Sequence, residues 1–362
     1  MDVDTWGQAW DWSVDHPALA ALAAMVGFDV AVKVVVQVLG RLPCCTCVFR
    51  LLGPVFFGAF IVQAMLLELA IVWPMLGTCR VLPRSAQKRV AAVARTIKAA
   101  TWRVVLFLCP WIRLDVQNLE LLDRLRPTQE RPIMFLMNHT SFFDSVIATG
   151  VAMRVTDIAP IHRVLGASSL LKIPILGSIF LAEMHIPVHF KSSKPGTFGL
   201  DDETRKSMEA DIQEAMEDKA LFGLFPEGQL NRDDVTRLEP FRHGSFRVAI
   251  QHDAVIWGWV AAGNNIVWPP SASIGGLPAA VKCAPVELAP QGTLQCLREA
   301  GTPLEPRPGQ TEEELRKEQC KALSEAMQAK MQVVLDGMFA ELRQEGEELT
   351  GEGFQLLKNE EP

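Results

Sequence analysis

The chain has 362 residues, enough for one ordinary α/β domain together with an appended segment. Hydrophobic residues make up 49% of it and the mean hydropathy is +0.16, which is high for a purely soluble enzyme. The formal net charge of −7 argues against nucleic acid as the main partner.

The eight cysteines do not form a metal-binding pattern. Three are clustered at Cys44, Cys45 and Cys47, and neither a histidine nor a second cysteine pair lies near enough to predict a zinc site. The scattered cysteines are typical of the reduced, buried thiols of a protein that faces the cytosol. The cluster precedes an apolar segment, so both S-palmitoylation and a structural role are open interpretations.

Two apolar segments near the N-terminus predict membrane-associated helices. The first sixteen residues contain no basic residue and therefore lack the positive leader of a secretory signal. Residues 17–40 are apolar except for Asp29 and Lys33, which stand four positions apart and are expected to pair on one helix face. We interpret this segment as a helix that associates with the membrane or weakly spans it.

The segment Leu51–Gly77 is the stronger candidate for a membrane span. Its roughly 27 residues are interrupted by Gln63 and Glu68, and they are long enough to cross a bilayer core of about 30 Å. A carboxyl group that faces lipid is costly, so Glu68 is expected to face another helix or the catalytic domain. The alternative is that both apolar helices simply pack on a soluble core.

A block of basic residues follows this second apolar segment. By the positive-inside tendency, the block and the domain after it are expected to face the cytosol, and anionic head groups are a second possible contact for the block. Trp102–Leu114 is a third apolar piece, too short to span and interrupted by Pro110, so we expect it at the interface or under the domain. The basic residues are Arg80, Arg84, Lys88, Arg89, Arg95, Lys98 and Arg103.

A short apolar strand that ends in a polar corner organises the middle of the chain. Pro132–Met137 predicts a buried strand, and Ser141 is then a natural N-cap for a helix. His139 precedes the cap and Asp144 falls in the first helical turn, so the two side chains are expected to hydrogen-bond across the corner. A histidine held by a carboxylate is a general base with a fixed tautomer, and the N–H groups of the helix start are candidates for holding developing negative charge. Asp144 also fits a capping box, in which its carboxylate merely accepts the Ser141 N–H.

A second short apolar strand begins at Leu221 and runs into Pro226, Glu227 and Gly228. Pro226 fixes the approach, and Gly228 leaves room for close backbone contact. The ordered pair Asn-His-Thr-Ser-Phe-Phe-Asp and Phe-Pro-Glu-Gly, about 80 residues apart, resembles the glycerolipid acyltransferase family, which contains the 1-acylglycerol-3-phosphate acyltransferases. The resemblance covers roughly residues 100–290.

The resemblance implies a role for each of these residues. In that family the histidine deprotonates a glycerol hydroxyl, which attacks an acyl thioester directly, and the aspartate orients the histidine; these roles fall on His139 and Asp144. Glu227 and Gly228 inherit binding of the acceptor. The chain has no Gly-x-Ser-x-Gly elbow, which argues against a serine acyl-enzyme, and it has no tyrosine to serve as an acid or oxyanion donor.

The candidates for binding an acceptor phosphate depart from the family pattern. The arginine of a third family motif aligns with Phe190, so its charge is missing, and the adjacent Lys191 is a point charge rather than a planar fork. Arg232 stands two positions later than the arginine that usually follows the second motif, and Arg242 resembles a basic residue that often comes next. These departures leave the reaction class intact but put the identity of the acceptor in doubt.

Alternating strand and helix patterns through this region predict an α/β architecture. Short strands are expected at Leu119–Arg124, Ile158–Ile161 and Ala254–Val260, and His185 and His189 are interpreted as the wet face of another strand. The remaining expected elements are an amphipathic helix over Asp201–Lys219, a loop over Asn264–Ala279 that lines an acyl channel or lies at the membrane interface, an irregular connection over residues 285–310, and a long helix opened by a capping box at Thr311.

The chain is thus predicted to be an α/β protein whose mainly parallel sheet is flanked by helices, with N-terminal transmembrane or membrane-associated helices. It divides into a membrane-anchoring region (1–100), an acyltransferase domain (101–290) and a C-terminal linker with an amphipathic helix (291–362).

The resemblance implies a membrane-bound enzyme of phospholipid biosynthesis, in the endoplasmic reticulum with its catalytic domain facing the cytosol. It transfers an acyl chain from acyl-CoA to the free hydroxyl of lysophosphatidic acid, and its partners are acyl-CoA, the lysophospholipid acceptor and membrane lipids. The chemistry requires no metal, and no cofactor besides acyl-CoA as co-substrate. The alternatives are an acyltransferase for another lysophospholipid or for glycerol phosphate, a membrane-anchored hydrolase and a non-catalytic lipid-binding protein.

Overall fold

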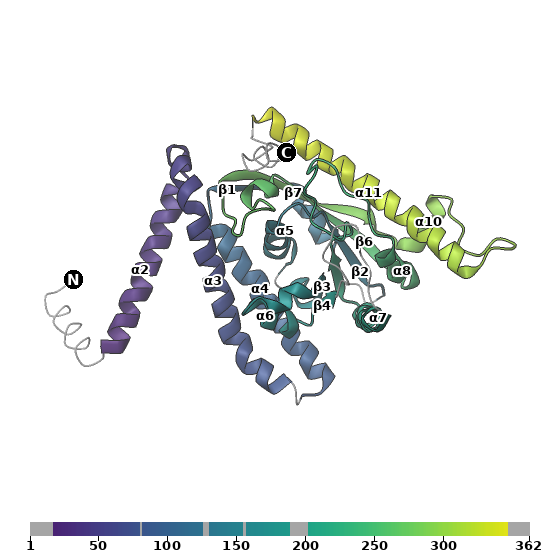
Figure 1. The fold of residues 1–362 in the computed structure, drawn as a ribbon, viewed down its shortest axis with the longest axis horizontal. Helices are drawn as coiled ribbons and strands as arrows, with labels where there is room; N and C mark the ends of the chain where they lie inside the picture. The colour runs from purple at the N-terminus through teal and green to yellow at the C-terminus, as the bar shows by residue number, and fades with distance from the viewer. Residues whose placement is uncertain (1–16, 80–81, 126–129, 155–156, 189–201, 347–362) are drawn as a thin grey trace, which may run out of the picture.

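A seven-stranded sheet lies at the centre of the fold, in the order β1-β7-β6-β2-β5-β3-β4. The computed structural model describes residues 17–79, 82–125, 130–154, 157–188 and 202–346 (Figure 1). Neighbouring strands are parallel except for β6 and β7, which confirms the predicted mainly parallel sheet. The strands are β1 (Ile112–Val116), β2 (Ile133–Met137), β3 (His162–Ala167), β4 (Ile186–Val188), β5 (Leu221–Leu224), β6 (Val255–Ala262) and β7 (Ala279–Ala289).

The central strand β2 is buried on both faces because helices cover both sides of the sheet. Its side chains alternate between two core clusters: Met134 and Leu136 face one, and Ile133, Phe135 and Met137 face the other. A parallel strand covered in this way is a continuous apolar run, which is why the sequence around residue 135 predicts it well.

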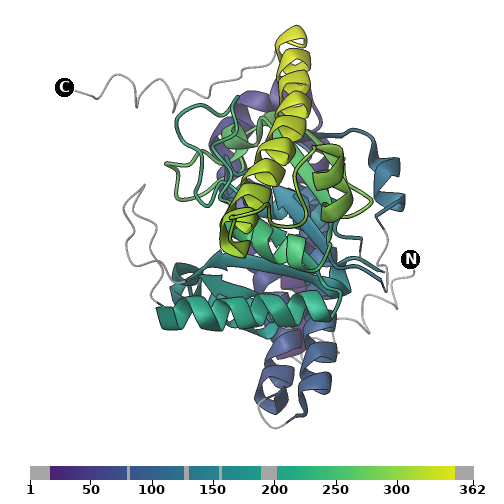
Figure 2. The ribbon, with the colours of Figure 1, turned by 90° about the vertical axis from the view of Figure 1, so that its right-hand side faces the viewer.

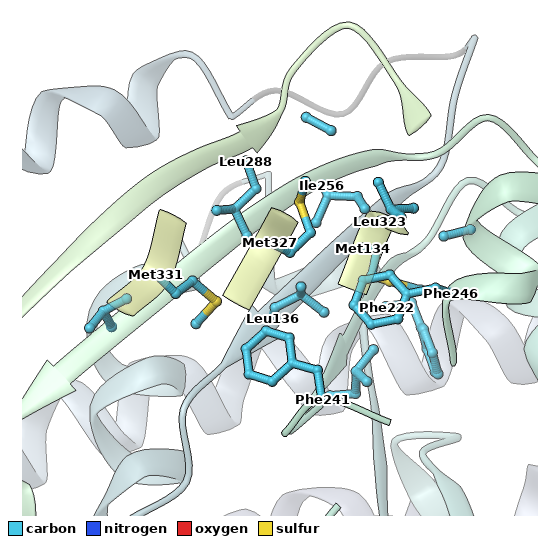
Figure 3. Packing of buried hydrophobic residues seen from close by; sticks show 14 of the residues in the cluster. Met134, Leu136, Phe222, Phe241, Phe246, Ile256, Leu288, Leu323, Met327 and Met331 are labelled. Atoms are coloured by element: carbon cyan, nitrogen blue, oxygen red, sulfur yellow. The ribbon is translucent and has the colours of Figure 1, made fainter. Parts of the chain in front are cut away.

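The helices on one face belong to the C-terminal half of the chain. Methionines of the long helix α11 pack on this face, as Figure 3 shows, and Figure 2 views the molecule from the side of α11. The predicted capping box at Thr311 is present, since Thr311 and Glu314 each accept the other's backbone N–H. The helices of this face are α7 (Asp202–Glu217), α8 (Gly244–Gln251), α10 (Thr293–Glu299) and α11 (Glu312–Gln344).

The N-terminal helices are α2 (Pro17–Leu39), α3 (Thr46–Cys79) and α4 (Arg84–Leu108), and α4 runs across the boundary predicted at residue 100. Of these helices, α3 and α4 lie toward the opposite face of the sheet, and α2 lies outside them. Asp29 and Lys33 form the expected ion pair at 2.5 Å, and Gln63 of α3 donates to Asp29 at 3.1 Å, so α2 is tied to α3. One helix in the described ranges, over Pro43–Trp73, is long and apolar enough to cross a membrane.

Helix α3 packs against the domain along one of its faces. Phe57 is fully buried and contacts Phe143 and Trp268 at ring-centroid distances of 5.8 Å each, and Glu68 near the other end is 2% exposed beside Glu183. The expectation that Glu68 faces the protein is therefore confirmed. The view in Figure 1 shows α3 and α4 running side by side between α2 and the sheet.

Four residues of the basic block, Arg84, Lys88, Arg95 and Lys98, make contacts within the protein. Arg84 and Lys88 pair with Glu214 of α7 at 2.6 and 3.2 Å, and Arg95 and Lys98 are directed toward the segment around Glu183. These side chains of α4 therefore hold α4 against the sheet domain. Arg80 lies outside the described residues.

Three predicted elements are wrong. Residues 159–161 form a 3-10 helix, because Pro160 has no N–H to offer a sheet, and the strand begins only at His162. Leu119–Asp123 is also a 3-10 helix, entered from Asn118 in the left-handed conformation at φ 50°. The expected connection over 285–310 contains the second half of β7 and helix α10. Pro285 is tolerated in β7 because β1 pairs with it only as far as Cys283.

Candidate active site

The polar corner after β2 lies at the carboxyl edge of the parallel strands. Asn138, 1% exposed, fixes this corner to β6: its amide donates to the Ala261 carbonyl and accepts the Ala261 N–H, each at 2.9 Å. The chain then turns into the short helix α5 (Phe143–Ile147). Two neighbouring strands thus hold the corner in place.

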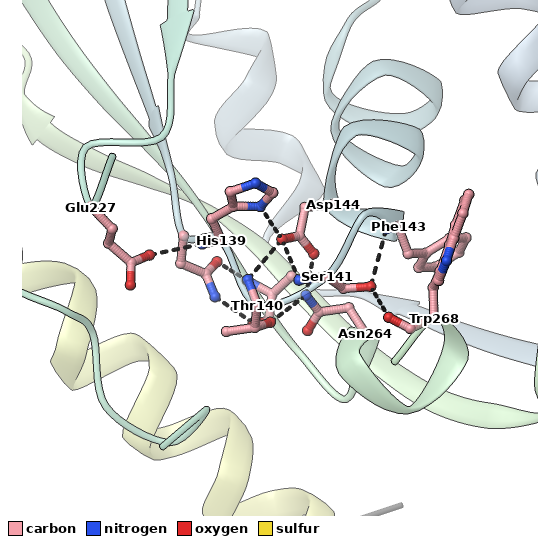
Figure 4. A network of polar contacts seen from close by, with 10 residues as sticks. His139, Thr140, Ser141, Phe143, Asp144, Glu227, Asn264 and Trp268 are labelled. Carbon is pink, nitrogen blue, oxygen red and sulfur yellow. Dashed lines mark hydrogen bonds and ion pairs between the residues drawn. The ribbon is translucent and has the colours of Figure 1, made fainter. Parts of the chain in front are cut away.

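His139 and Asp144 meet at this corner, as Figure 4 shows. The His139 Nδ1 lies 3.0 Å from Asp144 Oδ2, which also accepts the N–H groups of Thr140 and Ser141 at 2.9 Å each. The histidine–carboxylate contact and the capping contact to Ser141 are therefore both present, and the two interpretations of Asp144 are compatible. Three hydrogen bonds to one oxygen fix the position of the carboxylate.

The contact with Asp144 sets the tautomer of His139. Because Nδ1 faces a carboxylate oxygen, it carries the proton, and the lone pair is on Nε2. The side chain is 18% exposed and its ring stacks on Phe225 at 3.9 Å, which fixes the plane of the imidazole. No group in the described part of the chain hydrogen-bonds to Nε2, so this nitrogen is available to a substrate.

Three backbone N–H groups at this corner, those of Thr140, Ser141 and Phe143, do not hold developing negative charge as expected, because each already donates to a side chain. Those of Thr140 and Ser141 are taken by Asp144, and the N–H of Phe143 donates to Ser141 Oγ at 3.0 Å. Ser141 Oγ in turn donates to the Trp268 carbonyl at 2.7 Å. The helix begins at Phe143, so Ser141 precedes its N-cap position by one residue.

Glu227 lies against the same corner from β5. The residue is 1% exposed; one carboxylate oxygen accepts the His139 N–H at 2.8 Å and the other accepts the Glu239 N–H at 2.9 Å. Burial raises the pKa of Glu227 to about 8, although the two backbone donors oppose that shift. Both oxygens are engaged by the backbone, so the geometry makes Glu227 a support of the His139 turn rather than a free ligand for an acceptor.

Gly228 and Arg242 lie together beside Glu227. Gly228 has φ +73°, and a Cβ there would lie 3.1 Å from Arg242 Cγ. The Arg242 N–H donates to the Pro226 carbonyl at 2.7 Å, and its Nε to the Glu227 carbonyl at 3.3 Å. Of the basic residues predicted to bind the acceptor phosphate, Arg242 therefore lies against the second motif.

The other predicted basic residues are placed differently. Arg232 is exposed and follows Asn231, whose N–H donates to the His139 carbonyl at 2.7 Å. Lys191, Phe190 and His189 lie outside the described residues. His185 is not on a wet strand face: it is buried, and its Nε2 lies 2.7 Å from Glu183.

Sequence reasoning did not identify Asn264 or Trp268 as parts of the site. Asn264 begins the short helix α9 (Asn264–Val267) directly after β6, and its side-chain amide donates to Asp144 Oδ1 and, at 2.7 Å, to Thr140 Oγ1. The signal was available, because a polar residue that follows a parallel strand lies at the same sheet edge as the end of its neighbour, here β2. Within the described ranges, no group of three histidine, cysteine or acidic side chains is arranged to hold a metal.

A comparison with protein-family models agrees with the motif resemblance. Residues 113–260 match the family model described as Acyltransferase. Among solved structures, the chain is similar to the 1-acyl-sn-glycerophosphate (LPA) acyltransferase PlsC from Thermotoga maritima, with 16% identity, a TM-score of 0.48 and coverage of 78% of this chain and 97% of that one. A comparison with curated protein sequences gives no significant match.

Proposed function

We propose that this chain, whose residues 113–260 match the Acyltransferase family model, transfers an acyl group from acyl-CoA to the free hydroxyl of lysophosphatidic acid. The observation that carries the proposal is the His139–Asp144 pair, with Nε2 unoccupied at the carboxyl edge of the sheet. This pair falls inside the matched segment, and the resemblance assigns it the role of base and orienter.

The proposed reaction needs one base and no covalent intermediate on the protein. Nε2 of His139 removes the proton from the acceptor hydroxyl, and the oxygen attacks the thioester carbonyl. The C–S bond then breaks, and the departing CoA sulfur takes the proton from the imidazolium. Asp144 holds the ring and stabilises its positive charge during the step.

Ser141 does not compete as a nucleophile. Its hydroxyl accepts the Phe143 N–H and donates to the Trp268 carbonyl, so its proton is directed away from His139. This arrangement supports direct transfer to the acceptor over an acyl-serine route.

The acceptor phosphate is proposed to bind beside Gly228. Arg242 supplies a cation there, and the absence of a side chain at Gly228 leaves the backbone open. Arg232 and Lys191 remain proposed contributors on the basis of their sequence positions alone.

Lipid substrates are proposed to enter from a membrane that contacts the outer face of α3. Gly53, Phe57 and Glu68 of this helix face the domain, while residues at helical spacing on the opposite side are exposed. A helix covered by protein along one face is not surrounded by lipid, so we propose that its outer face contacts the bilayer. The exposed residues are Leu51 (77%), Val55 (63%), Val62 (52%) and Leu66 (49%).

A panel of acceptors tests the proposed reaction. Labelled oleoyl-CoA is incubated with membranes that contain the wild type or His139→Ala, together with lysophosphatidic acid, other lysophospholipids or glycerol 3-phosphate. Phosphatidic acid formed by the wild type alone supports the proposal, and preference for another acceptor reassigns the substrate. Release of free fatty acid alone indicates a hydrolase, and no product in any arm indicates a non-catalytic lipid-binding protein.

A further inference from the structure

Asp144 has a second carboxylate oxygen that the contact with His139 does not use. Oδ1 accepts a hydrogen bond from the side-chain amide of Asn264, while Oδ2 serves His139 and two backbone N–H groups. The same amide nitrogen donates to Thr140 Oγ1 at 2.7 Å (Figure 4). Asn264 therefore holds the far side of the carboxylate and the residue next to His139.

The orientation of the Asn264 amide follows from its partners. Its nitrogen faces a carboxylate oxygen, whereas a flipped amide would place its own oxygen there and repel it. Asn264 is fully buried, and its Oδ1 has no hydrogen-bond partner among the described residues. A buried amide oxygen without a partner is unfavourable, so this side chain is poorly explained as part of the packing.

The backbone around Asn264 fixes its distance from the corner. Gly263 has φ +83°, and a Cβ there would lie 2.2 Å from the Ala280 carbonyl oxygen, so only glycine allows this exit from β6. Asn138 ties the end of β2 to Ala261, three residues before Asn264. Asn264 and Asp144 are thus mounted on two strands that are held together.

We propose that Asn264 is a positioning residue that completes a His139–Asp144–Asn264 unit. By fixing the rotation of the Asp144 carboxylate, it keeps Oδ2 directed at His139 Nδ1 and so keeps the proton on Nδ1 and the lone pair on Nε2. The kinetic consequence of this inference rests on the proposed function. The effect of Asn264 on the imidazole tautomer does not depend on turnover.

The test compares Asn264→Leu, which has a similar volume and no donor, with the matched control Asn265→Leu. Asn265 is the next residue of the same helix and is 6% exposed, and among the contacts of the described residues it makes no hydrogen bond to Asp144 or His139. In Asn264→Leu, kcat is expected to fall on the order of 10²-fold with KM nearly unchanged, because the base is misplaced while the binding surface is intact. Asn265→Leu keeps the wild-type kcat.

The independent readout is the ¹⁵N spectrum of the histidine rings, with the His139 signals assigned by their loss in His139→Gln. The neutral wild-type ring is expected as the Nδ1–H tautomer, and Asn264→Leu is expected to gain the Nε2–H form. An unchanged tautomer and kcat in Asn264→Leu would overturn the proposal. If Asn264→Leu does not fold, Asn264→Ala is measured in the same two assays. If the wild type transfers no acyl group, the proposed function fails and the ¹⁵N comparison still decides the role of Asn264.

Discussion

Glu227 shows how one residue acts in a way that its motif does not reveal. The sequence places it beside a glycine in a pattern associated with acceptor binding, but its two oxygens accept backbone N–H groups from His139 and Glu239. His139 lies 88 residues before Glu227 and Glu239 lies 12 residues after it, beyond the motif itself, so the motif alone could not predict these partners. By contrast, the meeting of His139 and Asp144 follows from five residues of sequence and one strand-to-helix corner.

The pKa of Glu227 gives a pH dependence of stability. The buried carboxyl titrates near 8 in the folded protein and near 4.5 in an unfolded chain, so between these values the folded state binds more protons. Its contribution to stability is therefore fully present below about pH 4.5 and is lost as pH rises through about 8. In Glu227→Gln this contribution no longer varies with pH, so the free energy of unfolding falls less steeply from pH 5 to 8.

Denaturant unfolding at several pH values measures this slope. The exposed residue Glu120 provides the control Glu120→Gln, in which the wild-type slope is retained. Equal slopes for wild type and Glu227→Gln would contradict the assignment of the raised pKa to the burial of Glu227.

At the scale of elements, a buried polar cluster joins α3 and α4 to the segment after α6 (Leu176–Ala182). Lys98 Nζ lies 2.6 Å from the Glu183 carboxylate, and Glu183 is 0% exposed. Glu68 is also buried beside Glu183. His185 accepts the Val164 N–H on Nδ1, so it offers Glu183 an Nε2–H, and burial lowers the pKa of His185 to about 4. Burial alone would raise the pKa of Glu183, but the neighbouring Lys98 ammonium outweighs this effect and holds that pKa below its usual range.

Lys98→Met is expected to destabilise the protein by about 3–5 kcal/mol, because it leaves a buried carboxylate without its cation. Without Lys98 the pKa of Glu183 rises, so the loss is larger at pH 8 than at pH 5. The control is Lys88→Met on the same helix, where the lysine is 35% exposed and pairs with Asp218 at 2.6 Å. That change costs less than about 1 kcal/mol. Equal losses for the two variants in denaturant unfolding would contradict this account.

The predicted elements differ in how much local sequence determines them. Long periodic or continuously apolar segments such as β2, α7 and α11 are confirmed, because their residue patterns match one geometry over several turns or strand residues. The predictions for the short pieces at residues 119–123 and 159–161 are wrong because a segment of three to five residues fits a strand or a 3-10 turn equally well. The second half of β7 was missed because Pro285 is tolerated only in the context of where β1 ends.

At the scale of the whole molecule, the hydropathy of the chain is explained by an apolar helix with two different faces. Sequence analysis recognised α3 as long and apolar but could not show that the domain covers one side of it. That arrangement depends on contacts such as Phe57 with Phe143 and Gly53 with Gly276, which join segments far apart in the chain.

Replacing outer-face residues is expected to weaken membrane binding without unfolding the protein. The double change Val55→Glu and Val62→Glu lowers partitioning onto phosphatidylcholine vesicles by about tenfold or more per residue, because each buried valine contributes about 1.5 kcal/mol or more. The matched control is Val333→Glu on α11, on the other side of the sheet, where the residue is 71% exposed. Vesicle flotation that does not distinguish the double variant from the control would refute the membrane contact of α3.

The role of His139 as the base is the central claim, and the initial rate of acyl transfer in His139→Ala tests it most directly. The wild type and the variant are compared at saturating acyl-CoA and the best acceptor of the panel, with folding matched by thermal unfolding. The rate is expected to fall by about 10²- to 10⁴-fold, because the hydroxyl proton then has no positioned acceptor. A folded variant that retains the wild-type rate would contradict the account.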